Sequence, residues 1–433
     1  PLLRSRLSLM MFLQYATWGA WLPLLYPFLA NYRGFSNTEI AWIFSVGAAG
    51  AIVAPFIAGQ IADRYFPTQW FLGLSHLAGG LLIWQLDRVE TFVPFFIFSL
   101  VYSIIYSPTL SLTNSLSFHH LPDRDRDFGK VRVWGTVGWI TAGIMIGQWL
   151  FLNHTDAALD AEAQELAYQS EMGAAFRLSG LLGILMGLYC FTLPHTPPQK
   201  GKEPSAVLEA IGELRKRPLL VLFLVAVPIS CIHQFYFYHV AAFLGKYQSA
   251  DTTFIDRIFG TGGGGLATIG QMSEIVVLAS IPFFAKHFSR KMFLLIGTAA
   301  YAIRMVLFAY VEDITAVTGL DPLAVLIPGV ALHGLCFGCF IFVSFMIVDE
   351  ETTPDVRASA QSLFNLVIIG FGIIVGSFVA GQVADWFTKD ETLNYTGLFS
   401  VPLWASVAVF AVLLLAYPRR RPATVRAVEG DAA

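Results

Sequence analysis

Long apolar runs alternate with short polar breaks along the chain from Leu7 to Tyr417. A helix needs about 20 apolar residues to cross the hydrocarbon layer of a membrane. Twelve runs fit that requirement, and we predict a membrane-spanning helix in each. They occupy residues 7–29, 37–61, 69–87, 92–117, 133–152, 173–193, 218–245, 263–285, 291–311, 323–348, 359–384 and 398–417.

The longest charged and proline-rich break covers residues 194–217, between the sixth and seventh runs. It divides the chain into two halves of six helices each. We therefore predict an N-terminal bundle over residues 1–193, a linker over 194–217, a C-terminal bundle over 218–418 and a tail over 419–433.

Lysine and arginine residues concentrate in the loops on one side of this arrangement, which includes the N-terminus, the linker and the tail. The loop over residues 153–173 falls on the other side and contains neither lysine nor arginine. Because cytoplasmic loops carry the excess of positive residues, both termini and the linker are predicted to be cytoplasmic.

The composition supports a membrane protein, because charged residues make up 13% of the 433 residues and soluble domains carry about 25%. We expect the lipid bilayer to surround the chain. A formal net charge of −3 and the lack of a basic stripe exclude a nucleic-acid partner. Cys336 and Cys339 lack a second pair of ligands, so we expect no metal site and no cofactor.

Two segments repeat each other inside the chain. Residues 56–63 read FIAGQIAD and residues 378–385 read FVAGQVAD, which are identical at six of eight positions. Each copy closes the middle helix of a three-helix unit, and the predicted topology places the two copies on opposite faces. This arrangement is typical of nested inverted-topology repeats.

The first copy leads into Gly59-Gln60-Ile61-Ala62-Asp63-Arg64, which resembles the G-x-x-x-D-R signature of the major facilitator superfamily. The resemblance implies an all-α fold of twelve transmembrane helices in two six-helix bundles. It also implies that Gly59, Asp63 and Arg64 gate the cytoplasmic side. An aspartate at a helix end can face the positive N-terminus of another helix, here the one that starts near Arg357.

Further motifs resemble one branch of that superfamily, the bacterial nucleoside:proton symporters. They are Phe12–Tyr15 with Trp18 and Gly19, Pro108–Leu110, Arg132–Gly138, Gln271–Glu274 and Arg357–Gln361. The resemblance implies a secondary active transporter, not an enzyme, that imports nucleosides with protons by alternating access. It also implies a location in the bacterial inner membrane, and we expect a monomer.

Glu274 is the one acidic residue near the centre of a predicted span. An ionisable side chain inside a membrane is costly and is a candidate for function by default. Burial disfavours the charged form of a carboxylate, so Glu274 can bind and release the coupled proton. The alternatives are that Glu274 only joins helices, or that His233, His239 or His333 shares the proton-carrying role.

Amide, aromatic and arginine side chains in the spans suit a flat, neutral, hydroxylated solute, since they can bond its hydroxyl groups and stack on its ring. The family resemblance implies that one set forms the nucleoside site: Arg132, Thr136, Trp139, Gln234, Gln271, Glu274 and Phe337. Further substrate-binding candidates are Gln14, Asn114, Phe237 and Asn365.

Two positions depart from the family pattern: Phe237 stands in place of an asparagine, and Gly338 in place of an aspartate. They leave substrate specificity open and place more of the proton coupling on Glu274. The alternative within transport is a facilitator or symporter for sugars or glycosides, and a binding-only receptor is a third hypothesis. Arg304 is expected to be a structural anchor near a carbonyl or carboxylate, and Gly260–Gly265 a flexible hinge.

Overall fold

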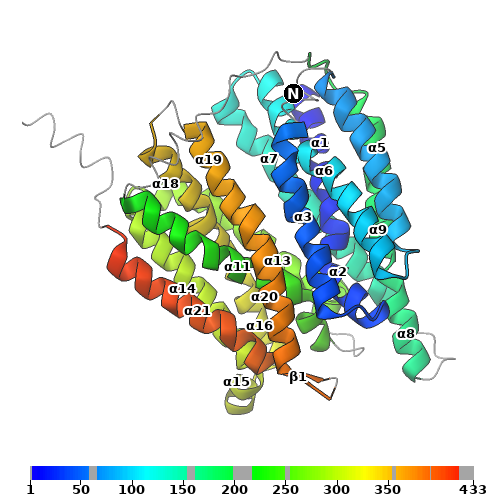
Figure 1. The fold of residues 1–433 in the computed structure, drawn as a ribbon, viewed down its shortest axis with the longest axis vertical. Helices are drawn as coiled ribbons and strands as arrows, with labels where there is room; N and C mark the ends of the chain where they lie inside the picture. The colour runs from blue at the N-terminus through cyan, green and yellow to red at the C-terminus, as the bar shows by residue number, and fades with distance from the viewer. Residues whose placement is uncertain are drawn as a thin grey trace, which may run out of the picture. The chain divides into compact units, whose positions relative to one another are not determined.

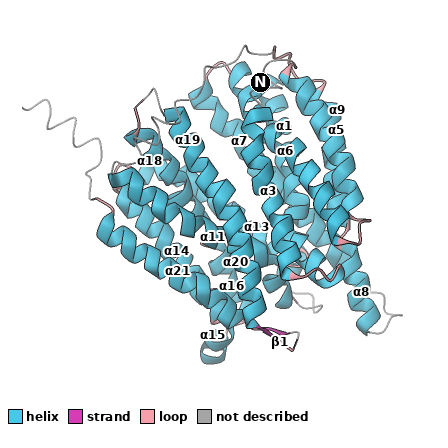
Figure 2. Cartoon of the chain, in the orientation of Figure 1, coloured by secondary structure: helices cyan, strands magenta, loops and turns pink. Residues whose placement is uncertain are grey.

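The computed structural model describes residues 2–57, 66–153, 161–197, 217–248, 254–353, 357–390 and 392–418. Nearly all of this backbone is helical (Figure 2). The strands within the described ranges are β1 (Thr388–Lys389) and β2 (Thr392–Leu393), which pair antiparallel in a short hairpin. The protein is therefore an all-α structure, as the apolar runs predict.

The chain divides into two compact units. Unit 1 comprises residues 1–203 with 237–268, and unit 2 comprises residues 204–236 with 269–433. Two continuous helices, α11 (Arg217–Lys246) and α13 (Gly264–Phe284), contribute residues to both units.

The other helices of unit 1 are α1 (Leu2–Trp21), η1 (Leu22–Leu24), α2 (Leu25–Pro27), η2 (Phe28–Tyr32), α3 (Asn37–Ile57), α5 (Thr68–Leu86), α6 (Phe92–His120), α7 (Arg124–Leu152), α8 (Ala161–Glu171), α9 (Ala174–Cys190) and α12 (Phe254–Phe259). Helices α5 and α9 run side by side (Figure 1). An apolar core joins α1, α5, α6, α7 and α9 through side chains such as Leu7, Leu72, Leu116, Val131 and Met186.

Glycines let α1 and α7 approach each other closely. A Cβ atom at Gly19 would lie 2.7 Å from the Cα of Trp139, and one at Gly138 would overlap the carbonyl oxygen of Phe12. Small residues at such positions allow membrane helices to pack backbone against backbone. This contact fixes the face of α7 that carries Arg132 and Trp139.

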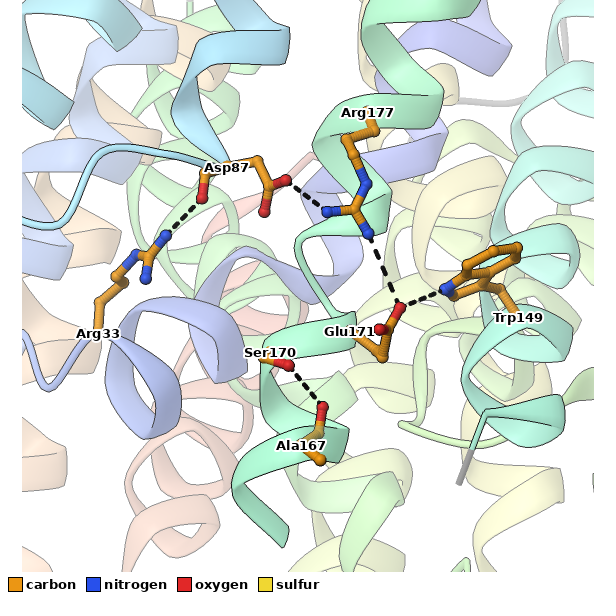
Figure 3. A network of polar contacts seen from close by, with 7 residues as sticks. All are labelled: Arg33, Asp87, Trp149, Ala167, Ser170, Glu171 and Arg177. Atoms are coloured by element: carbon orange, nitrogen blue, oxygen red, sulfur yellow. Dashed lines mark hydrogen bonds and ion pairs between the residues drawn. The ribbon is translucent and has the colours of Figure 1, made fainter. Parts of the chain in front are cut away.

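A polar network fastens the ends of several helices in unit 1 (Figure 3). Arg177 bridges Asp87 at 2.6 Å and Glu171 at 3.7 Å. The indole nitrogen of Trp149 donates to Glu171 at 2.8 Å, and Arg33 donates to the carbonyl oxygen of Asp87 at 2.5 Å. The network thereby ties α5, α7, α8 and α9 together at one end.

The glycine run after α12 is held by one amide side chain. Nε2 of Gln248 donates to the carbonyl oxygen of Gly260 at 2.7 Å and to Asp256 at 3.0 Å, and Oε1 accepts from the Gly263 N–H at 2.7 Å. Gly260 and Gly263 have positive φ angles of 73° and 75°, which glycine adopts without strain. The segment expected to be a flexible hinge is a hydrogen-bonded turn in the described residues.

The other elements of unit 2 are α14 (Arg290–Ala309), α15 (Val311–Thr318), α16 (Pro322–Ala331), α17 (His333–Leu335), η4 (Cys336–Phe342), α18 (Val343–Glu351), α19 (Arg357–Asn365), η5 (Leu366–Phe371), α20 (Gly372–Phe387) and α21 (Tyr395–Ala416). Helices α14 and α21 pack side by side (Figure 1), and the buried ammonium of Lys291 donates to two carbonyl oxygens at the C-terminal end of α21, at 2.8 and 2.6 Å. The η4 and η5 segments are π-helical, a geometry that is frequent at functional sites.

Ten of the described helices are long and apolar enough to cross a membrane. The first and third expected spans form helices α1 and α5, which are not among the ten. Each of these two helices carries a buried polar side chain, Gln14 and His76 respectively. The first copy of the repeat covers residues 56–63, and residues 58–63 lie outside the described residues, so the inverted-repeat arrangement stays a prediction.

Candidate functional site

Arg132, Thr136 and Trp139 lie along one side of α7, in unit 1, because positions three and four residues apart share a helix face. The guanidinium carbon of Arg132 lies 4.1 Å from the centre of the Tyr15 ring, within cation–π range. Gly135 leaves room for this contact, since a Cβ there would lie 2.6 Å from the Tyr15 ring and 2.8 Å from Arg132.

An aromatic row continues from Trp139 across unit 1. The Trp139 and Trp18 rings meet edge to face, with ring centres 5.3 Å apart, and the ring centres of Trp18 and Tyr106 are 6.2 Å apart. Tyr106 in turn stacks on Tyr102 at 5.3 Å. Such rings provide flat apolar surface with polar edges, which is what a nucleobase stacks on.

Gln14 has both ends of its side-chain amide bonded to protein groups. Its Nε2 donates to the Thr109 hydroxyl at 2.8 Å, and Nε2 of His76 lies 2.7 Å from its Oε1. The Tyr106 hydroxyl donates to the backbone carbonyl oxygen of Gln14 at 2.7 Å. Gln14 is fully buried, so this geometry suits a structural polar cluster better than direct contact with a solute.

Asn114, on α6 in unit 1, has a different environment. Its side-chain oxygen is buried and has no hydrogen-bond partner among the described residues. A buried polar atom of this kind is uncommon in folded proteins. Asn114 therefore offers an open acceptor for a donor group of a solute.

In unit 2, Gln234 and Gln271 are both buried amides. Nε2 of Gln234, on α11, donates to the Ser377 hydroxyl of α20 at 3.0 Å. Gln271 lies one helical turn before Glu274 on α13, as the sequence spacing predicts.

Glu274 faces an imidazole. Its Oε2 lies 3.9 Å from Nε2 of His333, with side-chain exposures of 16% for Glu274 and 1% for His333. Close packing of α17 on α13 sets this approach. The Gly334 N–H donates to the Ser273 hydroxyl at 3.0 Å, and a Cβ at Gly334 would lie 2.7 Å from the backbone nitrogen of Glu274.

The opposite ring nitrogen of His333 faces Arg304. Nη1 of Arg304 lies 3.3 Å from Nδ1 of His333, and the guanidinium carbon lies 3.9 Å from the Tyr236 ring centre and 5.1 Å from that of Tyr301. Arg304 is fully buried, and its Nε and Nη2 atoms have no hydrogen-bond partner among the described residues. Its partners are an imidazole and two aromatic rings, where we expected a carbonyl or carboxylate.

His233 completes this group of side chains. Its Nδ1 lies 2.6 Å from the Tyr301 hydroxyl, and its ring stacks on His333 at 5.2 Å and lies 6.3 Å from the Phe337 ring. The Tyr236 ring also stacks on that of His333, with ring centres 5.4 Å apart. The sequence does not show that these side chains meet. It shows only that polar and aromatic residues occur within the apolar runs.

The remaining candidates are dispersed. Phe237 is on α11 but belongs to unit 1, as does His239, whose ring packs 5.1 Å from Tyr26. Asn365 ends α19, directly before the π-helical η5. Gly59, Asp63 and Arg64 lie outside the described residues. Among the residues that are described, no group of three or more metal-binding side chains could hold a metal ion.

Known proteins resemble the chain over nearly its whole length. The chain is 32% identical to YegT of Escherichia coli (strain K12), with 99% of this chain and 96% of YegT covered. It is 26% identical to the nucleoside permease NupG of the same strain, with 95% and 94% covered, and 28% identical to its xanthosine permease, with 94% of each covered.

The fold matches a solved transporter. The crystal structure of the nucleoside transporter NupG superposes with a TM-score of 0.80 at 24% identity, covering 96% of this chain and 100% of that chain. This likeness shows a fold of the major facilitator type. The profile of the family described as "Nucleoside H+ symporter" matches residues 2–422. The chain therefore belongs to the nucleoside H+ symporter family.

Proposed function

We propose that the protein imports nucleosides together with protons across the bacterial inner membrane, by alternating access. Membership in the nucleoside H+ symporter family supports both the nucleoside and the proton. The relatives NupG and xanthosine permease are named for nucleoside transport, and both match the chain over almost its full length.

The observation that carries the proton part of the proposal is the environment of Glu274. Its carboxylate lies within an apolar spanning helix, is largely buried and faces the imidazole of His333. Binding a proton would remove the buried charge, which lowers the cost of closing the protein around Glu274. Releasing the proton would restore that charge and complete the cycle.

We propose that polar and aromatic side chains of the predicted spans bind the nucleoside. Amides and arginine would bond its hydroxyls and base edges, and aromatic rings would stack on the base. The proposed residues are Arg132, Thr136, Trp139, Asn114, Gln234, Gln271, Glu274 and Phe337, with Phe237 and Asn365 as further candidates. Gln14, whose amide is already bonded at both ends, would act by holding α1 in place.

The proposal includes the finer architecture. It has twelve spanning helices in two six-helix bundles, over residues 1–193 and 218–418, related by nested inverted repeats. The linker 194–217, the tail 419–433 and both termini are cytoplasmic, and the protein acts as a monomer. Gly59, Asp63 and Arg64 gate the cytoplasmic side.

Glu274→Gln tests the proton part, because glutamine keeps the shape of the side chain and cannot carry a proton at this position. Purified protein in proteoliposomes is given labelled uridine or adenosine under an inward proton gradient. We expect accumulation to fall at least about tenfold. Counterflow, in which internal nucleoside exchanges for labelled external nucleoside, should persist because it needs no net proton movement.

Glu312→Gln, on the exposed surface of α15, is the matched control and should leave accumulation unchanged. Undiminished accumulation by Glu274→Gln would contradict the proposed coupling. Competition by a panel of nucleosides, nucleobases and sugars tests the substrate class in the same vesicles. Inhibition by sugars but not by nucleosides would contradict the substrate proposal.

A further inference from the structure

Arg304 is an unusual residue to find fully buried in a spanning helix. A charged group inside a membrane is costly unless other groups compensate for it. Here the compensation in the described residues comes from the faces of Tyr236 and Tyr301 and from one ring nitrogen of His333. None of these groups carries a negative charge when the imidazole is neutral and the phenols are protonated.

Contact with Arg304 determines which nitrogen of His333 carries a proton. A guanidinium has N–H donors and no acceptor, and it stays charged at all relevant pH values. Nδ1 of His333, at 3.3 Å from Nη1 of Arg304, can therefore interact favourably only as an acceptor. In a neutral imidazole the proton then resides on Nε2, the nitrogen that faces Glu274.

The same contact disfavours a charged His333. Protonation of Nδ1 would place an imidazolium against a guanidinium in a buried site, where like charges repel strongly. Among the described residues, the other titratable groups shown beside His333 are His233 and Tyr236 on α11 and Glu274 on α13, and Tyr301 on α14 bonds His233. Glu274 is the acidic member of this set, and it faces Nε2.

We propose that Arg304 is a positioning residue for the transported proton. By contacting Nδ1 of His333, Arg304 keeps the imidazole neutral, with its N–H on Nε2 toward Glu274. Glu274, and not His333, then carries the proton. The inference rests on the proposed function, in which Glu274 couples proton and nucleoside. It assigns Arg304 a role in the coupling, and it excludes His333 as an alternative carrier.

Two substitutions of His333 separate a donor role from a carrier role. Glutamine can accept from Arg304 through Oε1 and donate to Glu274 through its amide, yet it does not titrate. Leucine can do neither. We expect His333→Gln to accumulate nucleoside within about threefold of the unmodified protein with the same pH profile, and His333→Leu to fall at least about tenfold.

Two substitutions of Arg304 test the charge. Arg304→Lys keeps the charge and a donor, so it should retain more proton-driven accumulation than Arg304→Met, which removes both. Arg304→Met also removes the positive charge on the far side of His333 from Glu274, and a positive charge favours the ionised form of a carboxylate. The half-maximal pH of proton-driven uptake should therefore move upward in that variant, while counterflow persists.

The experiment measures accumulation, counterflow and the pH profile of uptake for these four variants in proteoliposomes, with Glu274→Gln in parallel. Counterflow identifies variants that are folded. Loss of accumulation by His333→Gln with counterflow intact would overturn the inference, since His333 would then be the carrier. An unshifted pH profile in Arg304→Met would also overturn it. Intact accumulation by Glu274→Gln would instead contradict the proposed function itself.

Discussion

Each of the two units buries a polar cluster between its helices, and the clusters differ in how their members are bonded. The Gln14 cluster of unit 1 consists of Gln14, His76, Tyr106 and Thr109, and each member has a hydrogen-bond partner within it. The Arg304 cluster of unit 2 consists of Arg304, His333, Glu274, Tyr236, Tyr301 and His233. It holds a permanent cation and an acid, and two guanidinium nitrogens lack hydrogen-bond partners among the described residues.

This difference in hydrogen bonding suggests different roles for the two clusters, one in stability and one in transport. A neutral cluster whose donors and acceptors are all paired stabilises one arrangement of its helices. A cluster with a cation, a titratable acid and incompletely bonded donors changes its energy whenever a proton binds or leaves. We therefore propose that the Gln14 cluster holds unit 1 together and that the Arg304 cluster takes part in proton coupling.

Gln14→Leu should have the largest effect on stability. It removes the partner of two buried side chains, His76 and Thr109, and an unsatisfied buried group costs about 1–3 kcal/mol each. Thermal unfolding in detergent should show a clear loss of stability. Transport per folded molecule should change little.

The matched control is Gln85→Leu, an exposed glutamine on α5, which should leave the melting temperature nearly unchanged. If Gln14→Leu kept its thermal stability and lost nucleoside affinity, the two clusters would not differ in the way described. Gln14 would then belong to the substrate site.

Asn114→Ala tests a polar residue of unit 1 that lies outside the Gln14 cluster. Its side-chain oxygen has no hydrogen-bond partner among the described residues, so its removal breaks no bond in that part of the chain. We expect little loss of thermal stability. The half-saturating nucleoside concentration should rise about three- to tenfold, the equivalent of one neutral hydrogen bond.

The measurement is initial uptake rate against nucleoside concentration in proteoliposomes. Ser111→Ala, also on α6, is a suitable control because its hydroxyl bonds a carbonyl of its own helix, that of Pro108. An unchanged half-saturating concentration in Asn114→Ala would remove this residue from the substrate site.

Arg177→Gln should have the smallest effect. The ion pair with Asp87 is short, at 2.6 Å, but the Arg177 side chain is 39% exposed (Figure 3). Exposed pairs contribute about 0–1 kcal/mol, and salt screens them. We expect a small drop in melting temperature that disappears at high salt, with transport unchanged. A large drop independent of salt would show that charge alone does not distinguish stabilising from functional clusters.

Several features of the molecule could be predicted from the sequence. The apolar runs predict an all-helical membrane protein, and short motifs such as Gln271–Glu274 indicate the family that the whole-chain comparison confirms. Glu274 was identifiable because an acid in an apolar helix has few ordinary explanations.

The sequence could not show which side chains of different helices contact each other. Arg304 and His333 are 29 residues apart, and Gln14 and His76 are 62 apart, on different helices. An amide within a span looks the same in sequence whether it binds a solute, as expected of Gln14, or two neighbouring side chains, as found. Likewise, glycine content alone did not distinguish a flexible hinge from the bonded turn around Gln248.

The most direct test of the central claim is nucleoside-driven proton entry, followed with a pH-sensitive dye trapped inside proteoliposomes. Glu274→Gln and His333→Gln are compared at matched protein amounts, with counterflow measured on the same vesicles. The account predicts that nucleoside addition acidifies vesicles containing His333→Gln and fails to acidify those containing Glu274→Gln. Acidification by Glu274→Gln, or its loss in His333→Gln with counterflow preserved, would contradict it.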